Sequence, residues 1–174
     1  PYLRLVALGG EPTPLSILSS WTGRQTMRLA NTYGVTECCV YNTLGYLAPG
    51  DKPGHVGLPL ARNTLYVARL ASEADEGSEG GAHDSSLSHE AEALEEGELL
   101  IGGAQVGDGY ANRPDITRQK FIQHATLGRA YVTGDVAKAD SDGFTLLGRR
   151  DSQVKIRGNR IELAEVESWV MDAA

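Results

Sequence analysis

From His55 onward the chain is divided into short runs of alternating apolar residues, and this division constrains the fold more than any other feature. The runs include "LYVARL", "GELLIGG", "AYVTGDVAKAD" and "FTLLGRR", and turns rich in Gly, Asp and Ser separate them. Alternation with a period of two is typical of strands that bury one face. The pattern therefore predicts a small antiparallel barrel or sandwich over this part of the chain.

The residues before His55 predict a different arrangement. "YLRLVALGG" is a short apolar run that ends at paired glycines, as expected of a buried strand. "TPLSILSSWTG" then has apolar residues at helical spacing, with Thr13 placed to cap a helix and Pro14 in its first position. "MRLANTYG" and "CCVYNTLGYL" follow as two more strand-like pieces. A strand followed by a helix indicates the start of an α/β fold.

The net charge of −7 comes from one acidic segment. Between Ser72 and Glu98 there are ten acidic residues and no Lys or Arg, which leaves thirteen acidic against sixteen basic residues elsewhere. Residues 71–97 are poor in apolar side chains and predict a disordered or loosely helical surface insertion, more typical of a solvated linker than of a partner-binding segment. Because the basic residues are scattered among few aromatic residues, we expect no nucleic acid partner.

Length and cysteine content narrow the class of protein further. The 174 residues, 41% of them hydrophobic, fit a single-domain size, and the missing initial Met suggests a piece of a longer protein. No run of 18 apolar residues exists, so we expect no membrane association, and the start lacks the basic flank of a signal peptide. Cys38 and Cys39 are adjacent, which excludes a spaced zinc site and favours a reducing, cytoplasmic location.

The stretch "NTYGVTE", Asn31 to Glu37, allows two interpretations. Taken one at a time, its residues fit an ordinary turn in which Asn31 and Thr36 act as caps and Gly34 supplies a positive φ. Taken together, a hydroxyl and a carboxylate one residue apart can contact a phosphate and the magnesium ion bound to it, because a hard cation takes oxygen ligands. The tyrosine before the glycine can also lie against a base.

Three other polar stretches leave the same choice open. In "GGE" the glycines either end a strand or let the backbone approach a flat ring. In "YVTGDV", Asp135 lies within an apolar strand pattern and needs partners, which a ribose diol or an arginine can supply. In "GRRDSQVKIRG" the basic residues suit planar recognition of phosphate or diol oxygens, and a surface network of ion pairs explains them equally well.

Together and in this order, the four stretches resemble the adenylate-forming enzymes, specifically the amino-acid adenylation domains of nonribosomal peptide synthetases. "NTYGVTE" is similar to the family pattern N-x-Y-G-P-T-E, with Val35 in place of Pro. "GELLIGGAQVGDGYANRPDITRQKF", "YVTGDV" and "GRRDSQVKIRGNRIELAEVE" resemble three further family patterns, and only the acidic insertion falls outside the resemblance. "LRLVALGGEPTPLSILSSW" is also similar to the β-alanine-activating relatives.

The resemblance implies an α/β fold class with a division near residue 150. Residues 1–150 would be the C-terminal part of the large adenylation core, in which the end of a βα layer is followed by a small antiparallel β-barrel subdomain. Residues 151–174 would be the hinge and the truncated start of the small α+β C-terminal domain. Within that part, the alternation around "RGN" predicts a hairpin.

The resemblance also assigns roles to individual residues. Tyr33 would stack on adenine, Thr36 would contact the α-phosphate, and Asp135 would hold the ribose hydroxyls. The residues implied to bind ATP or AMP are Gly10, Glu11, Asn31, Tyr33, Thr36, Asp135 and Arg149. Thr36 and Glu37 would be the catalytic residues, with Glu37 as the ligand of Mg²⁺.

Other positions would serve the acid substrate and the second half-reaction. The implied substrate pocket, which suits a polar or small acid, consists of Ala7, Gly9, Thr32, Val40 and Tyr41. Asp151 would be the hinge, and Lys155 and Gly158 would lie on the face that forms the thioester. Leu146 stands where the family commonly has an aromatic residue near adenine.

The implied activity is ATP-dependent formation of aminoacyl-AMP and pyrophosphate, followed by loading of a phosphopantetheine thiol on a carrier-protein domain. The alternatives are an acyl-CoA ligase, a β-alanine-activating or aminoadipate-reductase-like enzyme, or a catalytically dead scaffold. Neither the acid nor the acceptor follows from the sequence. The family's phosphate-gripping loop and C-terminal lysine are not among the 174 residues, so we expect this stretch of chain to be inactive by itself.

Overall fold

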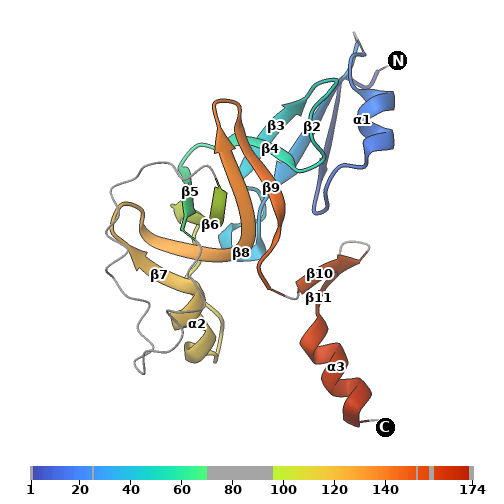
Figure 1. Ribbon diagram of the computed structural model, residues 1–174. Helices are drawn as coiled ribbons and strands as arrows, with labels where there is room; N and C mark the ends of the chain where they lie inside the picture. Colours follow the sequence, from blue (N-terminus) through green and yellow to red (C-terminus); the bar gives the residue numbers. More distant parts are fainter. Residues whose placement is uncertain (1, 25, 70–95, 152, 157–158, 173–174) are drawn as a thin grey trace.

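The computed structural model describes residues 2–24, 26–69, 96–151, 153–156 and 159–172 (Figure 1). Except for its last residues, 96 and 97, the predicted acidic insertion lies outside these ranges. Strands dominate, and the elements in chain order are β1 (Leu5–Gly9), α1 (Leu15–Trp21), β2 (Arg28–Tyr33), the 3₁₀ turn η1 (Thr36–Cys38), β3 (Thr43–Leu47), β4 (His55–Pro59), β5 (Asn63–Ala68), β6 (Glu96–Gly103), α2 (Pro114–Lys120), β7 (Phe121–His124), β8 (Gly128–Asp140), β9 (Gly143–Arg149), β10 (Gln153–Ile156), β11 (Asn159–Glu162) and α3 (Leu163–Asp172).

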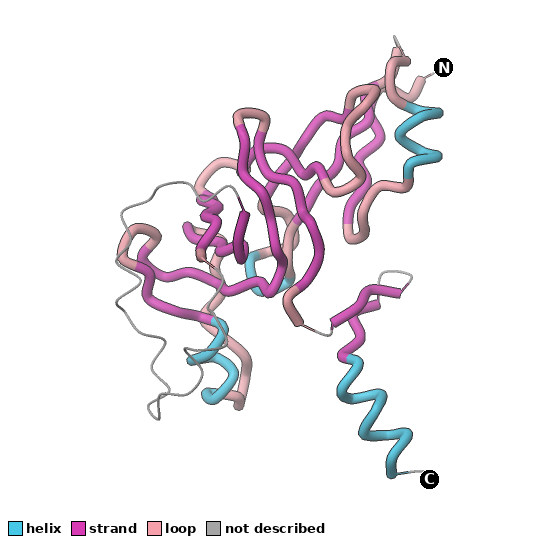
Figure 2. Tube along the Cα trace, viewed as in Figure 1, coloured by secondary structure: helices cyan, strands magenta, loops and turns pink. Residues whose placement is uncertain are grey.

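One mixed sheet contains most of these strands, which are drawn as the magenta segments in Figure 2. Its order is β1-β2-β3-β4-β9-β8-β6-β5, and β7 pairs with β8. β1 and β2 are parallel and are joined through α1, which confirms the predicted strand and helix, whereas the later neighbours are antiparallel. β4 pairs with β3 on one side and with β9 on the other, so the strands of the predicted βα layer and those of the predicted antiparallel subdomain belong to one continuous sheet. The fold is mostly β, with few helices.

The main hydrophobic core lies in the antiparallel part of the sheet. On β5 the buried residues Leu65 and Val67 follow the predicted period of two, whereas β6 is buried on both faces, with Leu99 and Ile101 in this core and Leu100 buried on the other face. A smaller core joins α1 to β2 and β3. The full set of buried residues in the main core is Tyr33, Cys38, Val56, Leu65, Val67, Leu99, Ile101, Phe121, Tyr131 and Ala137.

The segment between β2 and β3 differs from the sequence prediction. "CCVYNTLGYL" predicts a strand that starts at the cysteines, but β3 begins only at Thr43. Cys39 and Val40 have φ angles of 59° and 75°, which a strand does not accommodate. The amide of the fully buried Asn42 stabilises this turn, because its Nδ2 donates a hydrogen bond to the carbonyl oxygen of Cys38 at 2.8 Å.

The start of α1 also differs from the prediction. The helix begins at Leu15, Pro14 is the N-cap residue, and no side chain caps the first turn. Thr13 is therefore not the cap. Its backbone N–H donates instead to the carbonyl oxygen of Pro53 at 3.0 Å, which ties the start of the helix to the loop before β4.

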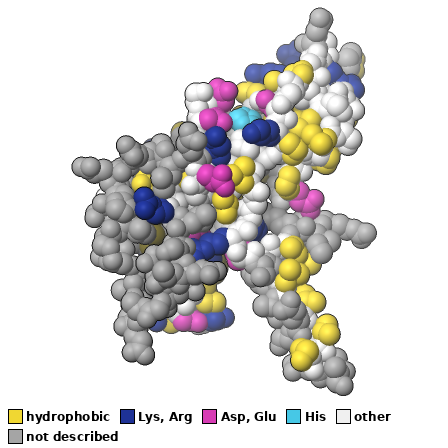
Figure 3. All heavy atoms as spheres, in the orientation of Figure 1, with side chains coloured by type: hydrophobic (Ala, Val, Ile, Leu, Met, Phe, Trp, Pro, Cys, Tyr) yellow, Lys and Arg dark blue, Asp and Glu magenta, His cyan; other side chains and the backbone are white. Residues whose placement is uncertain are grey.

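The predicted hairpin near the end of the chain is confirmed. β10 and β11 are antiparallel, with Val154 opposite Ile161, and α3 follows directly. In Figure 1 the hairpin and α3 follow β9 in the chain and lie apart from the other strands of the large sheet. None of the described helices is long and apolar enough to cross a membrane. Figure 3 shows apolar side chains along α3, and those that are exposed are Leu163, Val166, Trp169, Val170 and Met171.

The turn between β7 and β8 depends on a histidine. His124 accepts hydrogen bonds at Nδ1 from the backbone N–H groups of Thr126 and Leu127, both at 3.2 Å. Its ring also packs on Tyr66, with a centroid distance of 4.8 Å. Burial lowers the pKa of His124 from its ordinary value of 6.5. Since protonation of Nδ1 would remove the acceptor, the turn is stabilised above that ordinary value and loses this stabilisation as the pH falls through the lowered pKa.

We expect the backbone amides of Thr126 and Leu127 to lose protection from hydrogen exchange as the pH falls below 6.5, the ordinary value, and through the lowered pKa of His124. His124→Asn keeps a side-chain acceptor that does not titrate, so it should remove most of this pH dependence. Amide exchange measured by NMR or mass spectrometry, after correction for the intrinsic rates, tests this. The same pH dependence in His124→Asn would show that the histidine does not control the turn.

Candidate functional site

A cleft of about 640 Å³ lies where β2, the loop before β4, and β9 meet. Its walls contain residues 10–12, 31–34, 52–54 and 145–149, together with Val56 and Asp135. It therefore brings together parts of the "GGE", "NTYG", "TGD" and "GR" stretches, although Tyr33 and Asp135 are 102 positions apart in the sequence. The predicted nucleotide-binding residues that line the cleft are Gly10, Glu11, Asn31, Tyr33, Asp135 and Arg149.

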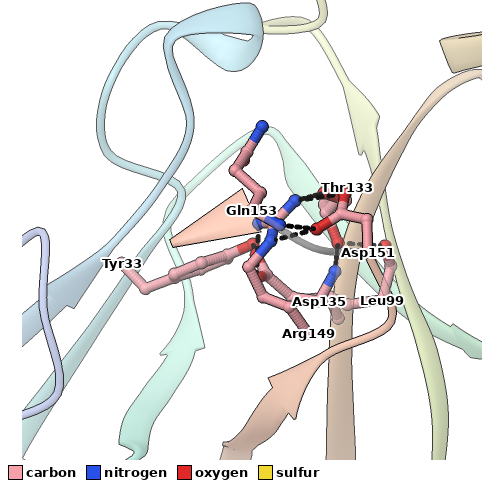
Figure 4. A network of polar contacts seen from close by, with 7 residues as sticks. All are labelled: Tyr33, Leu99, Thr133, Asp135, Arg149, Asp151 and Gln153. Atoms are coloured by element: carbon pink, nitrogen blue, oxygen red, sulfur yellow. Dashed lines mark hydrogen bonds and ion pairs between the residues drawn. The ribbon is translucent and has the colours of Figure 1, made fainter. Parts of the chain in front are cut away.

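Asp135 lies at the centre of a polar network in this cleft (Figure 4). Its Oδ2 accepts a hydrogen bond from the hydroxyl of Tyr33 at 2.5 Å, and its Oδ1 accepts one from Nη1 of Arg149 at 2.7 Å. Arg149 also donates from Nε and Nη2 to the two carboxylate oxygens of Asp151, at 2.6 and 2.7 Å. One guanidinium group thus links the acid of the cleft to the predicted hinge residue.

The backbone of β8 positions Asp135. The hydroxyl of Thr133 donates to the carbonyl oxygen of Leu99 at 2.7 Å and accepts from the backbone N–H of Asp135 at 3.0 Å. Gly134, between them, has a φ of 78°, and a Cβ atom there would lie 2.6 Å from the carboxylate of Asp151. The "TGD" stretch therefore needs a glycine for both its backbone conformation and the close approach of the hinge.

The protonation states of the neighbouring groups suit this network. Burial, and then the charge of Asp135, raises the pKa of Tyr33 well above its ordinary value, so its hydroxyl stays protonated and donates. Burial alone would raise the pKa of Asp151, but the hydrogen bonds and charge of Arg149 outweigh it and lower that pKa. Each carboxylate oxygen has more than one lone pair, so Asp135 can accept hydroxyl donors while it remains bound to Tyr33 and Arg149.

The other walls of the cleft combine apolar surface with backbone groups. Val56 and Leu146 lie beside Tyr33, and the Nδ2 of Asn31 donates to the carbonyl oxygen of His55 at 2.9 Å. A cavity of this kind, apolar with a few fixed polar groups, is typical of a site for a small organic ligand. A nucleoside fits its chemistry, because a base can lie on the apolar wall while its ribose hydroxyls donate to Asp135.

Thr36 and Glu37 lie in η1, directly after the wall of the cleft but not among the residues that line it. The hydroxyl-bearing side chain of Thr36 is exposed, and Oε1 of Glu37 accepts a hydrogen bond from the hydroxyl of Tyr110 at 2.5 Å. Both are hard oxygen donors. Burial, followed by the charge of Glu37, raises the pKa of the Cys38 thiol to about 12, so it offers no thiolate to a soft metal. This set of donors fits Mg²⁺ rather than Zn²⁺.

The predicted substrate-pocket residues fall into two groups. Gly9 lies opposite Thr32 in the parallel pair of strands, and Ala7 lies two residues before it on the same face of β1. A Cβ atom at Gly9 would lie 2.4 Å from the Oγ1 of Thr32. Val40 and Tyr41 lie in the turn before β3 and not in a strand, with exposed fractions of 58% and 54%. Of the five, Thr32 lines the cleft.

The predicted thioester face is described only in part. Lys155 lies in β10 opposite Arg160 of β11, and Gly158 lies outside the described residues. The roles of both residues stay predictions.

No role was predicted for Tyr110 or Asn42. The structure places both beside η1, the turn that carries Glu37. Tyr110 lies within "GDGYANRP", one of the matched stretches. Its place in that stretch was the available signal, and in the structure its partly buried hydroxyl has the hydrogen-bond partner that such a group needs. The sequence could not identify that partner, since Glu37 is 73 positions away.

Comparison with known proteins identifies the family of this chain. The profile of a family described as "AMP-binding enzyme" matches residues 1–111. Delta-poly-L-ornithine synthetase of Acinetobacter baumannii is 38% identical over 181 residues, which cover 99% of this chain and 12% of that protein. The chain therefore belongs to the AMP-binding enzyme family.

Solved structures define the class more closely. The Vibrio cholerae adenylation domain AlmE, in complex with glycyl-adenosine-5'-phosphate, has a TM-score of 0.70 and 29% identity over 95% of this chain and 30% of that one. PA1221, a nonribosomal peptide synthetase (NRPS) protein with adenylation and PCP domains, has a TM-score of 0.72 and 25% identity over 96% of this chain and 32% of that one. The chain is part of an adenylation domain of the NRPS type, within the adenylate-forming ligases, and it spans a small part of these relatives.

Arg149→Ala should lower the free energy of unfolding of the adenylation domain by about 3 kcal/mol, since it leaves two partly buried carboxylates without their counter-ion. The side chains of Asp135 and Asp151 are only 10% and 33% exposed. Arg113→Ala is the matched control, because the Arg113–Asp115 pair is more than half exposed and its loss should lower the free energy of unfolding less than that of Arg149 does. Urea unfolding of both variants measures the difference. Equal losses would contradict a structural role for the Arg149 network.

Proposed function

We propose that the whole protein is an ATP-dependent enzyme that activates an amino acid as its aminoacyl-AMP, with release of pyrophosphate. It then transfers the aminoacyl group to the phosphopantetheine thiol of a carrier-protein domain. The observation that carries this proposal is the convergence of the matched stretches on one cleft around Asp135. Two relatives support it, since one was solved with glycyl-adenosine-5'-phosphate and the other contains adenylation and PCP domains.

The nucleotide would bind in the cleft. Asp135 would accept the ribose hydroxyls, and Tyr33 and Arg149 hold its carboxylate in position for this. The ring of Tyr33 and the side chain of Leu146 supply apolar surface for adenine. Asn31, Gly10 and Glu11 would lie near the edge of the base, on the walls that they already form.

Positioning and charge neutralisation account for the first half-reaction. The carboxylate of the amino acid attacks the α-phosphorus, and pyrophosphate leaves with the electrons of the broken P–O bond. Thr36 would contact the α-phosphate with its hydroxyl, and Glu37 would hold Mg²⁺, which neutralises phosphate charge when bound. Neither residue needs to form a covalent bond to the substrate, since holding the reactants in line supplies much of the rate.

The second half-reaction needs the small domain to move. The carrier thiol loses its proton and attacks the acyl carbon, and AMP leaves with the electrons of the broken mixed-anhydride bond. Asp151 is the proposed hinge, and its two contacts with Arg149 hold it against the cleft in the arrangement seen here. Rotation that breaks these contacts would bring the face carrying Lys155 and Gly158 to the acyl group.

The acid itself is proposed to be a small or polar amino acid. Thr32 places a hydroxyl at the cleft, although this group already donates to the carbonyl oxygen of Leu8 at 2.8 Å. Ala7 and Gly9 would contribute small residues on one exposed face of β1, where the side chain of Thr32 already fills the space beside Gly9. Val40 and Tyr41 would complete the pocket from the turn before β3.

Glu37→Gln in the full-length enzyme should lower amino-acid-dependent ATP–pyrophosphate exchange at least about 10-fold, because it removes the carboxylate charge from the metal ligand. The enzyme is first tested against a panel of amino acids, and the best substrate is used for the variants. Glu96→Gln, at the exposed start of β6, is the matched control and should exchange at the wild-type rate. An unchanged rate in Glu37→Gln would remove Glu37 from the mechanism, and no exchange with any acid would contradict the proposed activity.

A further inference from the structure

The position of Glu37 is set by a loop that is distant in sequence. Between β6 and α2, the backbone N–H of Gly107 donates to the carbonyl oxygen of Glu37 at 2.9 Å. From the same loop, the hydroxyl of Tyr110 donates to Oε1 of Glu37 at 2.5 Å. A glutamate side chain on a short turn has several rotamers of similar energy. The contact from Gly107 holds the backbone at Glu37, and the contact from Tyr110 holds its carboxylate in one orientation.

Tyr110 is itself held firmly enough to serve as this anchor. Its backbone N–H donates to the hydroxyl oxygen of Thr117 at 2.9 Å, and its ring packs edge-on against Phe121 at a centroid distance of 5.6 Å. Its hydroxyl also lies 3.1 Å from the hydroxyl of Tyr131, a residue of β8 that is only 1% exposed. The phenol oxygen is thus fixed between the core of the sheet and the carboxylate.

The loop is braced from its other side by Arg129. The guanidinium donates from Nε to the carbonyl oxygen of Gly107 at 3.1 Å and from Nη2 to that of Asp108 at 2.6 Å. It also lies over the ring of Phe121, 5.2 Å from its centroid. The contacts to Glu37 therefore originate from a segment whose backbone and side chains are already ordered by β7 and β8.

We infer that Tyr110 is a positioning residue whose hydroxyl holds the Glu37 carboxylate in the orientation that binds the magnesium ion of MgATP. The inference rests on the proposed function, because it takes Glu37 as the metal ligand. A hydroxyl that orients a ligating carboxylate raises metal affinity by reducing the freedom that the carboxylate loses on binding. Tyr110 acts through Glu37 and does not touch the substrate.

This role is tested by how much Mg²⁺ strengthens the binding of ATP, and no acid substrate is needed. The dissociation constant of ATP for the full-length enzyme is measured with excess Mg²⁺ and again with EDTA, by competition against a fluorescent ATP analogue. The ratio of the EDTA value to the Mg²⁺ value reports how much the bound metal contributes. We expect Tyr110→Phe to lower this ratio about 10-fold, the size typical for loss of an outer hydrogen bond to a metal ligand, and to leave the EDTA value unchanged.

Tyr66→Phe is the matched control, because it also removes a phenol oxygen while the ring that packs on His124 remains. It should leave the ratio at the wild-type value. The double variant Glu37→Gln/Tyr110→Phe should have the same ratio as Glu37→Gln alone, since the hydroxyl then has no carboxylate to orient. A further fall in the double variant would show that Tyr110 acts by another route and would overturn the inference.

The remaining outcomes separate this inference from the proposed function. If Glu37→Gln lowers the ratio and Tyr110→Phe does not, Tyr110 is not a positioning residue, while Glu37 remains the metal ligand. If Glu37→Gln itself leaves the ratio unchanged, the metal role of Glu37 is wrong, and this inference fails with it. Should Tyr110→Phe fail to fold, Tyr131→Phe removes the hydroxyl next to that of Tyr110. The ratio should then fall, by less than Tyr110→Phe would lower it, and no change would overturn the inference.

Discussion

The carboxylate of Asp135, bound by Tyr33 and Arg149, is the interaction on which the rest of the site depends. It joins the end of β2 to the neighbouring strands β8 and β9, across 102 positions of sequence between Tyr33 and Asp135. A buried carboxylate without partners costs several kcal/mol, so the fold has to bring these groups together whether or not a ligand is present. The same two contacts bring the walls of the cleft together. Stability of the sheet and geometry of the nucleotide site therefore have a common origin.

Arg149 extends this network from the cleft to the hinge. One guanidinium serves two carboxylates, those of Asp135 and Asp151, and its planar fork allows both sets of contacts at once. Gly134 makes this possible, since any side chain at that position would meet the Asp151 carboxylate. A change at the ribose end of the cleft and a rotation at the hinge consequently act on the same side chain. The carboxylate of Glu37, in contrast, is held through Tyr110, by the aromatic residues of β7 and β8.

Sequence patterns predicted the parts of this arrangement that depend on local spacing. The alternating runs identified β5, β6, β8 and β9, the hairpin of β10 and β11 was expected, and matched motifs pointed to Asp135 and Arg149. Pairings between distant segments were not predictable, because local spacing does not contain them: β4 joins β3 to β9, and Tyr110 reaches Glu37 across 73 positions. The turn at Cys39 and Val40 was missed because hydrogen bonds from Asn42 outweigh the strand preference of these residues.

The most direct test of the nucleotide site is a crystal structure of the full-length protein with AMP. We expect the ribose hydroxyls within hydrogen-bonding distance of the Asp135 carboxylate, with Tyr33 and Arg149 still bound to it. Adenine should lie between the ring of Tyr33 and Leu146, in the cleft that these residues line. AMP bound at another place, or a ribose that does not contact Asp135, would contradict the assignment of this cleft as the nucleotide site.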